Sequence, residues 1–209
     1  MIPIVPDAIR RARANVDRRT AWREVATLLG GELVQGKRPS GDKVGVARGP
    51  WKIWLDTFTV HTGHASQTYT RCRAYFVGWH ELKVTVRRRN VFNRILEALG
   101  RSRPRAVSPP LLKTHVVRGK PASRLPSLFM AAGLVDALLS TAKVTLRVKR
   151  PSGRLRKRYG QDLGVVTCQA TGVVRDVNRL AGMIHIVGET LEALAGIGEA
   201  RKEEVAHGP

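Results

Sequence analysis

The sequence predicts an α+β fold: a mainly antiparallel sheet with helices on one face, followed by a long C-terminal amphipathic helix. Between residues 43 and 174, several segments alternate apolar and polar residues, which is typical of strands with one buried face. Near the C-terminus, apolar residues instead recur every three or four positions, which predicts a helix with one apolar face. These residues are Leu180, Ile184, Val187, Leu191 and Leu194. A long helix after an antiparallel meander is expected to pack on one face of the sheet.

The N-terminal region predicts one helix. Apolar residues recur at roughly helical spacing from Ile9 to Leu29, and Gly30 and Gly31 follow, as glycines do at a helix C-terminus. The first half of this helix is strongly basic. We therefore assign residues 1–20 to a basic N-terminal segment, expected to be loosely attached, and begin the folded domain at residue 21.

The middle of the chain predicts the strands of the sheet. Beyond Gly41 the period of the apolar residues changes from helical to two. Strands are expected at residues 43–47, 51–60, 67–77, 81–89, 115–118, 143–150 and 165–174. Two further helices are expected, at residues 90–99, which Asn90 can cap, and at residues 123–140.

The domain organisation follows from composition. We expect a single α+β domain over residues 21–200 and a flexible tail at residues 201–209. Residues 101–110 are basic and rich in proline, so they predict a linker between two halves of that domain. No apolar run approaches the roughly 20 residues needed to cross a bilayer, and residues 1–6 are too short and proline-broken for a signal peptide. We therefore expect a cytoplasmic protein that does not associate with membranes.

The net charge is large and unevenly distributed. The 209 residues contain 37 Lys and Arg against 16 Asp and Glu, a formal net charge of +21. Residues 57–160 contain 22 basic residues and only three acidic ones, a net charge of +19, whereas residues 161–209 have a net charge of −3. A concentrated excess of this kind predicts a partner that bears phosphates or carboxylates. It also fits the codon usage of a GC-rich genome, because arginine dominates the basic residues.

Signatures of catalysis and metal binding are incomplete. Residues 31–37 match the start of a P-loop, but Arg38 stands where Ser or Thr must bind magnesium. His61, His64 and Cys72 are too few for a zinc site, which needs about four ligands. Asp56 lies in a predicted strand, and we expect it to pair with Arg71 or Arg73 across the sheet. The sequence thus predicts no catalytic residue, no metal, no cofactor and no enzymatic activity.

The alternating strands predict a basic sheet face. In each of three strands the apolar residues fall on one side and the basic residues on the other. If these strands share one sheet, its solvated face carries Arg and Lys together with two tyrosines available for base stacking. The candidate nucleic-acid-binding residues are Tyr69, Arg71, Arg73, Tyr75, Lys83, Arg87, Arg89, Arg147 and Lys149.

Two functions are compatible with this face. The first is a non-enzymatic module that binds nucleic acid or another polyanion through the Arg-rich surface. The second is a structural or accessory subunit whose basic face docks on an acidic protein partner. The sequence indicates no oligomeric state.

Three segments carry a resemblance to a known group of proteins. They are Trp51-Lys-Ile-Trp-Leu-Asp-Thr-Phe-Thr-Val60, Thr68-Tyr-Thr-Arg-Cys-Arg73 and Gly172-Val-Val-Arg-Asp-Val-Asn-Arg-Leu180. Together they resemble a family of uncharacterised bacterial proteins whose pattern has a Leu-Asp-Thr strand, a Thr-Tyr-Thr-Arg-x-Arg strand and a closing Asp-x-x-x-Leu helix. The resemblance covers most of residues 20–200. That family has no assigned activity, so the resemblance implies no catalytic residues.

Overall fold

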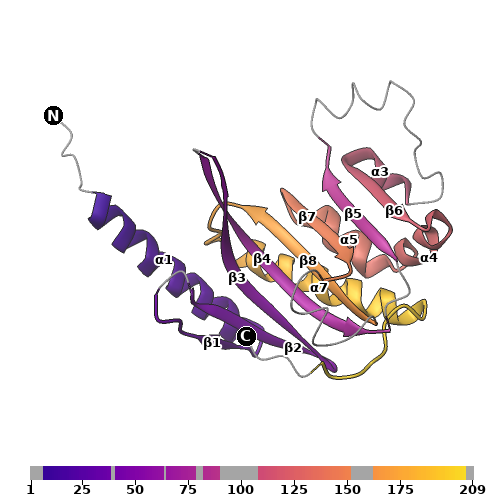
Figure 1. The fold of residues 1–209 in the computed structure, drawn as a ribbon, viewed down its shortest axis with the longest axis horizontal. Coiled ribbons are helices and arrows are strands. Elements are labelled where there is room, and N and C mark those ends of the chain that lie inside the picture. The colour runs from indigo at the N-terminus through magenta and orange to yellow at the C-terminus, as the bar shows by residue number, and fades with distance from the viewer. Residues whose placement is uncertain are drawn as a thin grey trace.

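The chain folds into one antiparallel sheet with its helices packed behind it (Figure 1). The computed structural model describes residues 7–38, 41–63, 65–78, 82–89, 108–151 and 162–205, with side chains from residue 17 onward. The sheet has eight strands in the order β1-β2-β3-β4-β8-β7-β5-β6, and every neighbouring pair is antiparallel. The predicted α+β class, with a mainly antiparallel sheet and a long C-terminal helix, is therefore confirmed.

The strands agree closely with the alternating segments of the sequence. They are β1 (Glu32–Val34), β2 (Lys43–Arg48), β3 (Trp51–Thr62), β4 (Ala65–Val77), β5 (Lys83–Arg88), β6 (His115–Lys120), β7 (Val144–Lys149) and β8 (Leu163–Thr171). Sequence reasoning missed β1, which is too short to show a period. The order of the strands departs from chain order, because β8 and β7 lie between β4 and β5.

The helices required more correction. They are α1 (Asp7–Leu28), α3 (Pro109–Thr114), α4 (Leu125–Phe129), α5 (Ala132–Ser140) and α7 (Val177–Gly196). The single helix expected at residues 123–140 is wrong, because Ala131 is extended and the segments on either side meet at 84°. The expected linker overlaps α3, which begins at Pro109. The helix expected at residues 90–99 and residues 101–107 of that linker lie outside the described residues.

No single helix among the described residues is long and apolar enough to cross a membrane. The segments 122–129 and 132–140 meet that test only as a pair, and they are bent by 84° at the break between them.

Helix α7 forms the centre of the core. All five residues of its predicted apolar stripe are buried, and Val187 and Leu191 have no exposed surface. The helix lies against β3, β4 and β8 and also contacts α1 and α5. Asp176 caps its first turn by accepting a hydrogen bond from the backbone N–H of Arg179 at 2.6 Å.

The second half of α1 belongs to the domain. Trp22 is fully buried and donates a hydrogen bond from its indole N–H to the Val174 carbonyl at 3.2 Å. Buried Asp42 accepts hydrogen bonds from Arg18 and Arg19 of the same helix. Burial by itself raises the pKa of Asp42, but the hydrogen bonds and charges of its partners outweigh it and lower that pKa. The domain boundary expected at residue 20 therefore falls inside a continuous, anchored helix.

Candidate functional site

The sheet has one core face and one face turned away from the helices, which we call the open face. In β4, Thr70, Cys72, Ala74 and Phe76 have no exposed surface, whereas the alternate residues are partly exposed. The same alternation holds in β5 and β7, as the sequence predicts. Because β4, β7 and β5 belong to one sheet, their outward residues share the open face.

Strand register arranges the open-face side chains in rows across the sheet. One row alternates arginine and threonine over five neighbouring strands, from β4 through β8, β7 and β5 to β6: Arg73, Thr167, Arg147, Thr85 and Arg118. Neighbouring strands lie about 4.8 Å apart, so the arginines of this row stand about 10 Å apart at their backbones. The short threonines between them leave each guanidinium room to reach a ligand.

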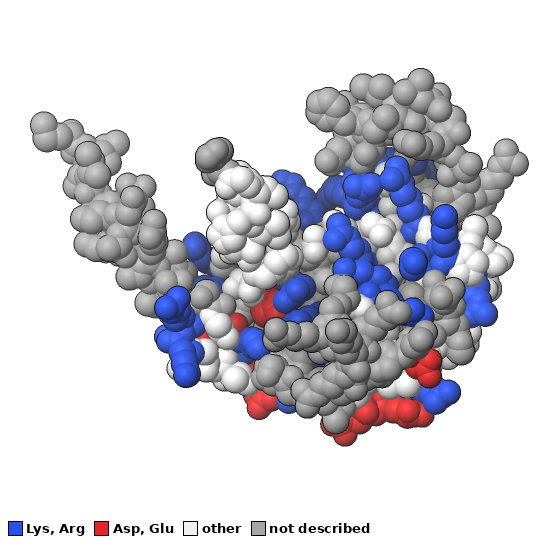
Figure 2. All heavy atoms as spheres, in the orientation of Figure 1, with Lys and Arg blue, Asp and Glu red and all other residues white. Residues whose placement is uncertain are grey.

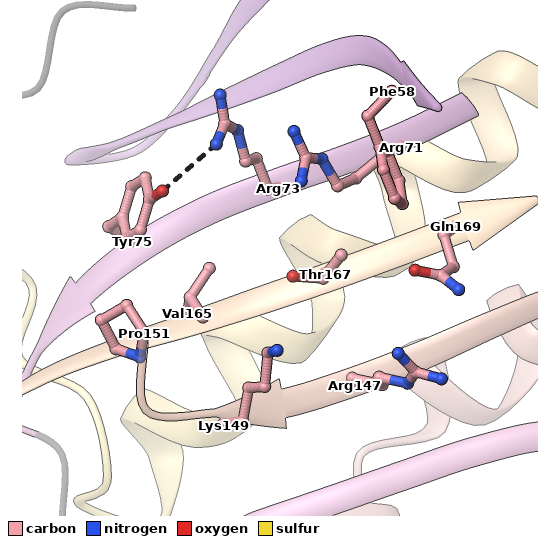
Figure 3. A pocket seen from close by; sticks show the side chains of 10 residues that line it. All are labelled: Phe58, Arg71, Arg73, Tyr75, Arg147, Lys149, Pro151, Val165, Thr167 and Gln169. Carbon is pink, nitrogen blue, oxygen red and sulfur yellow. Dashed lines mark hydrogen bonds between the residues drawn. The ribbon is translucent and has the colours of Figure 1, made fainter. Parts of the chain in front are cut away.

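A hollow lies on the open face over β8. Its floor consists of Val165, Thr167 and Gln169 of β8, and longer side chains of β4 and β7 rise on either side of that floor (Figure 3). The cavity has a volume of about 290 Å³ and is lined by Phe58, Arg71, Arg73, Tyr75, Arg147, Lys149, Pro151, Val165, Thr167 and Gln169. Five of the predicted residues thus meet around one cavity: Arg71, Arg73, Tyr75, Arg147 and Lys149.

Asp56 binds two of the predicted arginines, as expected from the sequence. Arg71 makes two hydrogen bonds of 2.8 Å to the two oxygens of Asp56, and Arg73 lies 3.0 Å from the same carboxylate. Asp56 is only 5% exposed, so these arginines cover it. The pairing removes one unit of net positive charge from this end of the face and fixes both guanidinium groups in place.

The open-face cations of β5, β6 and β7 make no ion pair with any residue in the described part of the chain. They are Arg147 and Lys149 of β7, Lys83 and Arg87 of β5, and Arg118 and Lys120 of β6. Arg118 and Lys120 were absent from the sequence prediction. The sequence does alternate over Val117-Arg118-Gly119-Lys120, which indicates that the two cations share one face of a strand. Only the pairing of β6 with β5 places them on the open face.

Arg89 differs from the other candidates. Strand β5 ends at Arg88, so no strand register places the Arg89 side chain on the open face. Its backbone N–H donates to the Thr114 carbonyl at 2.9 Å, which ties this position to the end of α3. Arg89 therefore belongs neither to the hollow nor to the row of arginines and threonines.

Both predicted tyrosines already contact neighbouring side chains, which the sequence does not indicate. Tyr69 stacks on Phe58 with ring centroids 5.3 Å apart and planes 19° apart. The Arg71 guanidinium lies 4.5 Å from the centroid of the Phe58 ring. The Tyr75 hydroxyl accepts a hydrogen bond from Arg73 at 3.3 Å (Figure 3). Tyr75 thus lines the hollow, whereas Tyr69 stands beyond it with one ring face against Phe58.

Most of the positive charge on the open face is not offset by acidic residues. The strands β4 to β8 contain no acidic residue on either face, and Asp56 of β3 is the acid that faces the hollow. Lys and Arg gather over the open face in Figure 2, whereas the visible Asp and Glu lie mostly along the lower edge. The open face is therefore a region of positive potential, which attracts anionic ligands.

The two cysteines lie opposite one another on the core face. Cys72 of β4 pairs in register with Cys168 of β8, and both are free thiols with no exposed surface. Burial raises the pKa of the Cys168 thiol to about 12 and also raises the pKa of Cys72. Since thiolates are the reactive form, both residues are expected to be chemically inert in the folded protein.

A thiol titration checks this expectation. Neither cysteine should react with an aromatic disulfide reagent at pH 8 in the native protein, and both should react once the chain is unfolded. Because the folded pKa values are raised, the stability contributed by the neutral thiols is complete below the ordinary thiol pKa of about 8.5 and declines as the pH rises toward 12. Equal rates in folded and unfolded protein would show that these strands open readily.

Within the described residues, no group of three or more His, Cys, Asp or Glu is placed to hold a metal ion. His61 pairs with the Ser66 hydroxyl at 2.7 Å in the exposed hairpin, and His64 lies outside the described residues.

Comparison of the chain with family models, curated proteins and solved structures finds no match.

Proposed function

We propose that this protein binds nucleic acid through the open face of its sheet. The observation that carries the proposal is the row of arginines that crosses five neighbouring strands with no acidic residue in them. Each phosphate that an arginine or lysine neutralises releases a counterion from the nucleic acid, and this release favours binding. The threonines of the row and Gln169 add hydroxyl and amide groups that can donate hydrogen bonds to phosphate oxygens.

The same geometry argues for binding that is largely independent of sequence. The open face is a sheet surface, and the described part of it presents no helix or arm that would read base edges in a groove. Its cations are therefore expected to contact the backbone, while Tyr75 at the hollow offers an aromatic ring to an unpaired base. Tyr69 has one ring face against Phe58 and is expected to contribute less.

A binding titration with labelled oligonucleotides tests the proposal. Two single strands of unrelated sequence should bind with similar affinity at about 50 mM salt, and the affinity should fall steeply as salt increases. Tyr75→Ala should weaken single strands more than duplexes, by about 1–3 kcal/mol for one stacked base, and Tyr69→Ala should have the smaller effect. Negligible binding at about 50 mM salt would refute the proposal and leave an acidic protein as the partner that fits this charge.

A further inference from the structure

The hollow over β8 carries more positive charge than one internal phosphate of a nucleic acid requires. Arg71, Arg73, Arg147 and Lys149 line it, and Asp56 behind the first two offsets one of these charges, which leaves a net formal charge of +3. A phosphodiester within a chain carries a single negative charge. A phosphomonoester at a chain end carries about −1.5 to −2 at pH 7 and presents three acceptor oxygens.

The size of the hollow also fits a chain end. Tyr75 and Pro151 lie at one end of it, and Phe58 and Gln169 lie toward the other (Figure 3). Its volume of about 290 Å³ is at the small limit of ligand pockets, which run from about 300 to 1,000 Å³. A phosphate and its adjoining sugar are small enough for such a space. The rest of the strand can then lie across the open face, along the row of arginines and threonines.

The donors match the chemistry of a phosphomonoester. Arg73 and Arg147 belong to one cross-sheet row, on either side of Thr167, and both side chains line the cavity. A guanidinium donates two parallel hydrogen bonds to phosphate oxygens, and Lys149 adds a compact charge. Asp56 holds the Arg71 and Arg73 side chains before any ligand arrives, which lowers the entropic cost of binding.

We propose that the hollow is a binding site for the terminal phosphomonoester of a nucleic-acid strand. This inference rests on the proposed function, since the strand attached to the phosphate occupies the open face. The 5′ and 3′ phosphates share the chemistry that the hollow recognises.

The experiment compares short single strands of about six nucleotides that carry a 5′-phosphate, a 3′-phosphate or only hydroxyl ends. At pH 7.5 at least one phosphorylated strand should bind about tenfold more tightly than the hydroxyl strand, which corresponds to about 1.4 kcal/mol. The preference should shrink at pH 5, because the second pKa of the phosphate is about 6. A nucleoside monophosphate should compete weakly, since it lacks the backbone that lies on the row.

A matched pair of double variants locates the effect. Arg147→Gln with Lys149→Gln alters the hollow, and Arg118→Gln with Lys120→Gln removes the same charge from β6 of the same face. Both should weaken the hydroxyl strand, but only the first should abolish the preference for a phosphorylated end.

The possible failures are distinguishable. Equal affinity for phosphorylated and hydroxyl strands would overturn the terminal-phosphate site and leave nucleic-acid binding intact, whereas absence of binding to every strand would refute the proposed function itself. A nucleoside monophosphate that binds as tightly as the phosphorylated strand would assign the hollow to free nucleotides instead.

Discussion

Val187→Asp is expected to leave the protein unfolded or insoluble. Val187 has no exposed surface, and its helix packs against the centre of the sheet. The substitution removes about 1.5–3 kcal/mol of apolar burial. It also places an unpaired carboxylate in the core, which costs several kcal/mol more. Together these losses approach the 5–15 kcal/mol that typically separates folded from unfolded protein. Solubility, circular dichroism and a thermal melt measure the outcome.

A control on the same helix separates burial from added charge. Asn178 is exposed in the first turn of α7, where a negative charge interacts favourably with the helix dipole. Asn178→Asp should therefore leave the melting temperature nearly unchanged. If Val187→Asp were equally soluble with an unchanged melting temperature, α7 would have to be an exposed helix rather than the centre of the core.

Most strands and the last helix could be predicted because their signal is local. In β4, β5 and β7 the period of two is directly visible, since one face is buried and the other is basic. The Asp56–Arg71 pair could also be predicted, because β3 and β4 form a hairpin whose register sets these residues opposite each other.

The sheet order and the complete site could not be predicted, because they depend on distant pairings. Nothing local to β7 or β8 indicates that they insert between β4 and β5, yet this insertion brings Arg147 and Lys149 to face Arg71 and Arg73. The hollow itself arises because β8 places short side chains between two strands that carry long ones. Composition shows the excess of arginine, but only the tertiary structure shows which arginines meet around the hollow.

Removing three open-face arginines is expected to weaken nucleic-acid binding strongly without affecting the fold. Arg87, Arg118 and Arg147 are exposed and make no ion pair with a described residue. Changing all three to glutamine should therefore leave the melting temperature close to that of the wild-type protein. Arg71 and Arg73 are unsuitable for this test, because their loss would leave the buried Asp56 carboxylate without its partners.

The control variant removes the same charge from other surfaces. Arg23 of α1 and Lys113 of α3 are exposed helix residues, and Arg88 pairs in register with buried His115 on the helix side of the sheet. Changing these three to glutamine lowers the net charge as much as the open-face variant does. A difference in binding between the two variants therefore reports the position of the charge rather than its amount.

The slope of log affinity against log salt for the wild-type protein and these two triple variants tests the central claim most directly. Each lost phosphate contact should reduce the magnitude of the slope by about 0.7 on single strands and about 0.9 on duplex. We predict a reduction of up to about 2 on single strands for the open-face variant and little change for the control variant. Equal slopes for all three proteins would contradict binding through the open face.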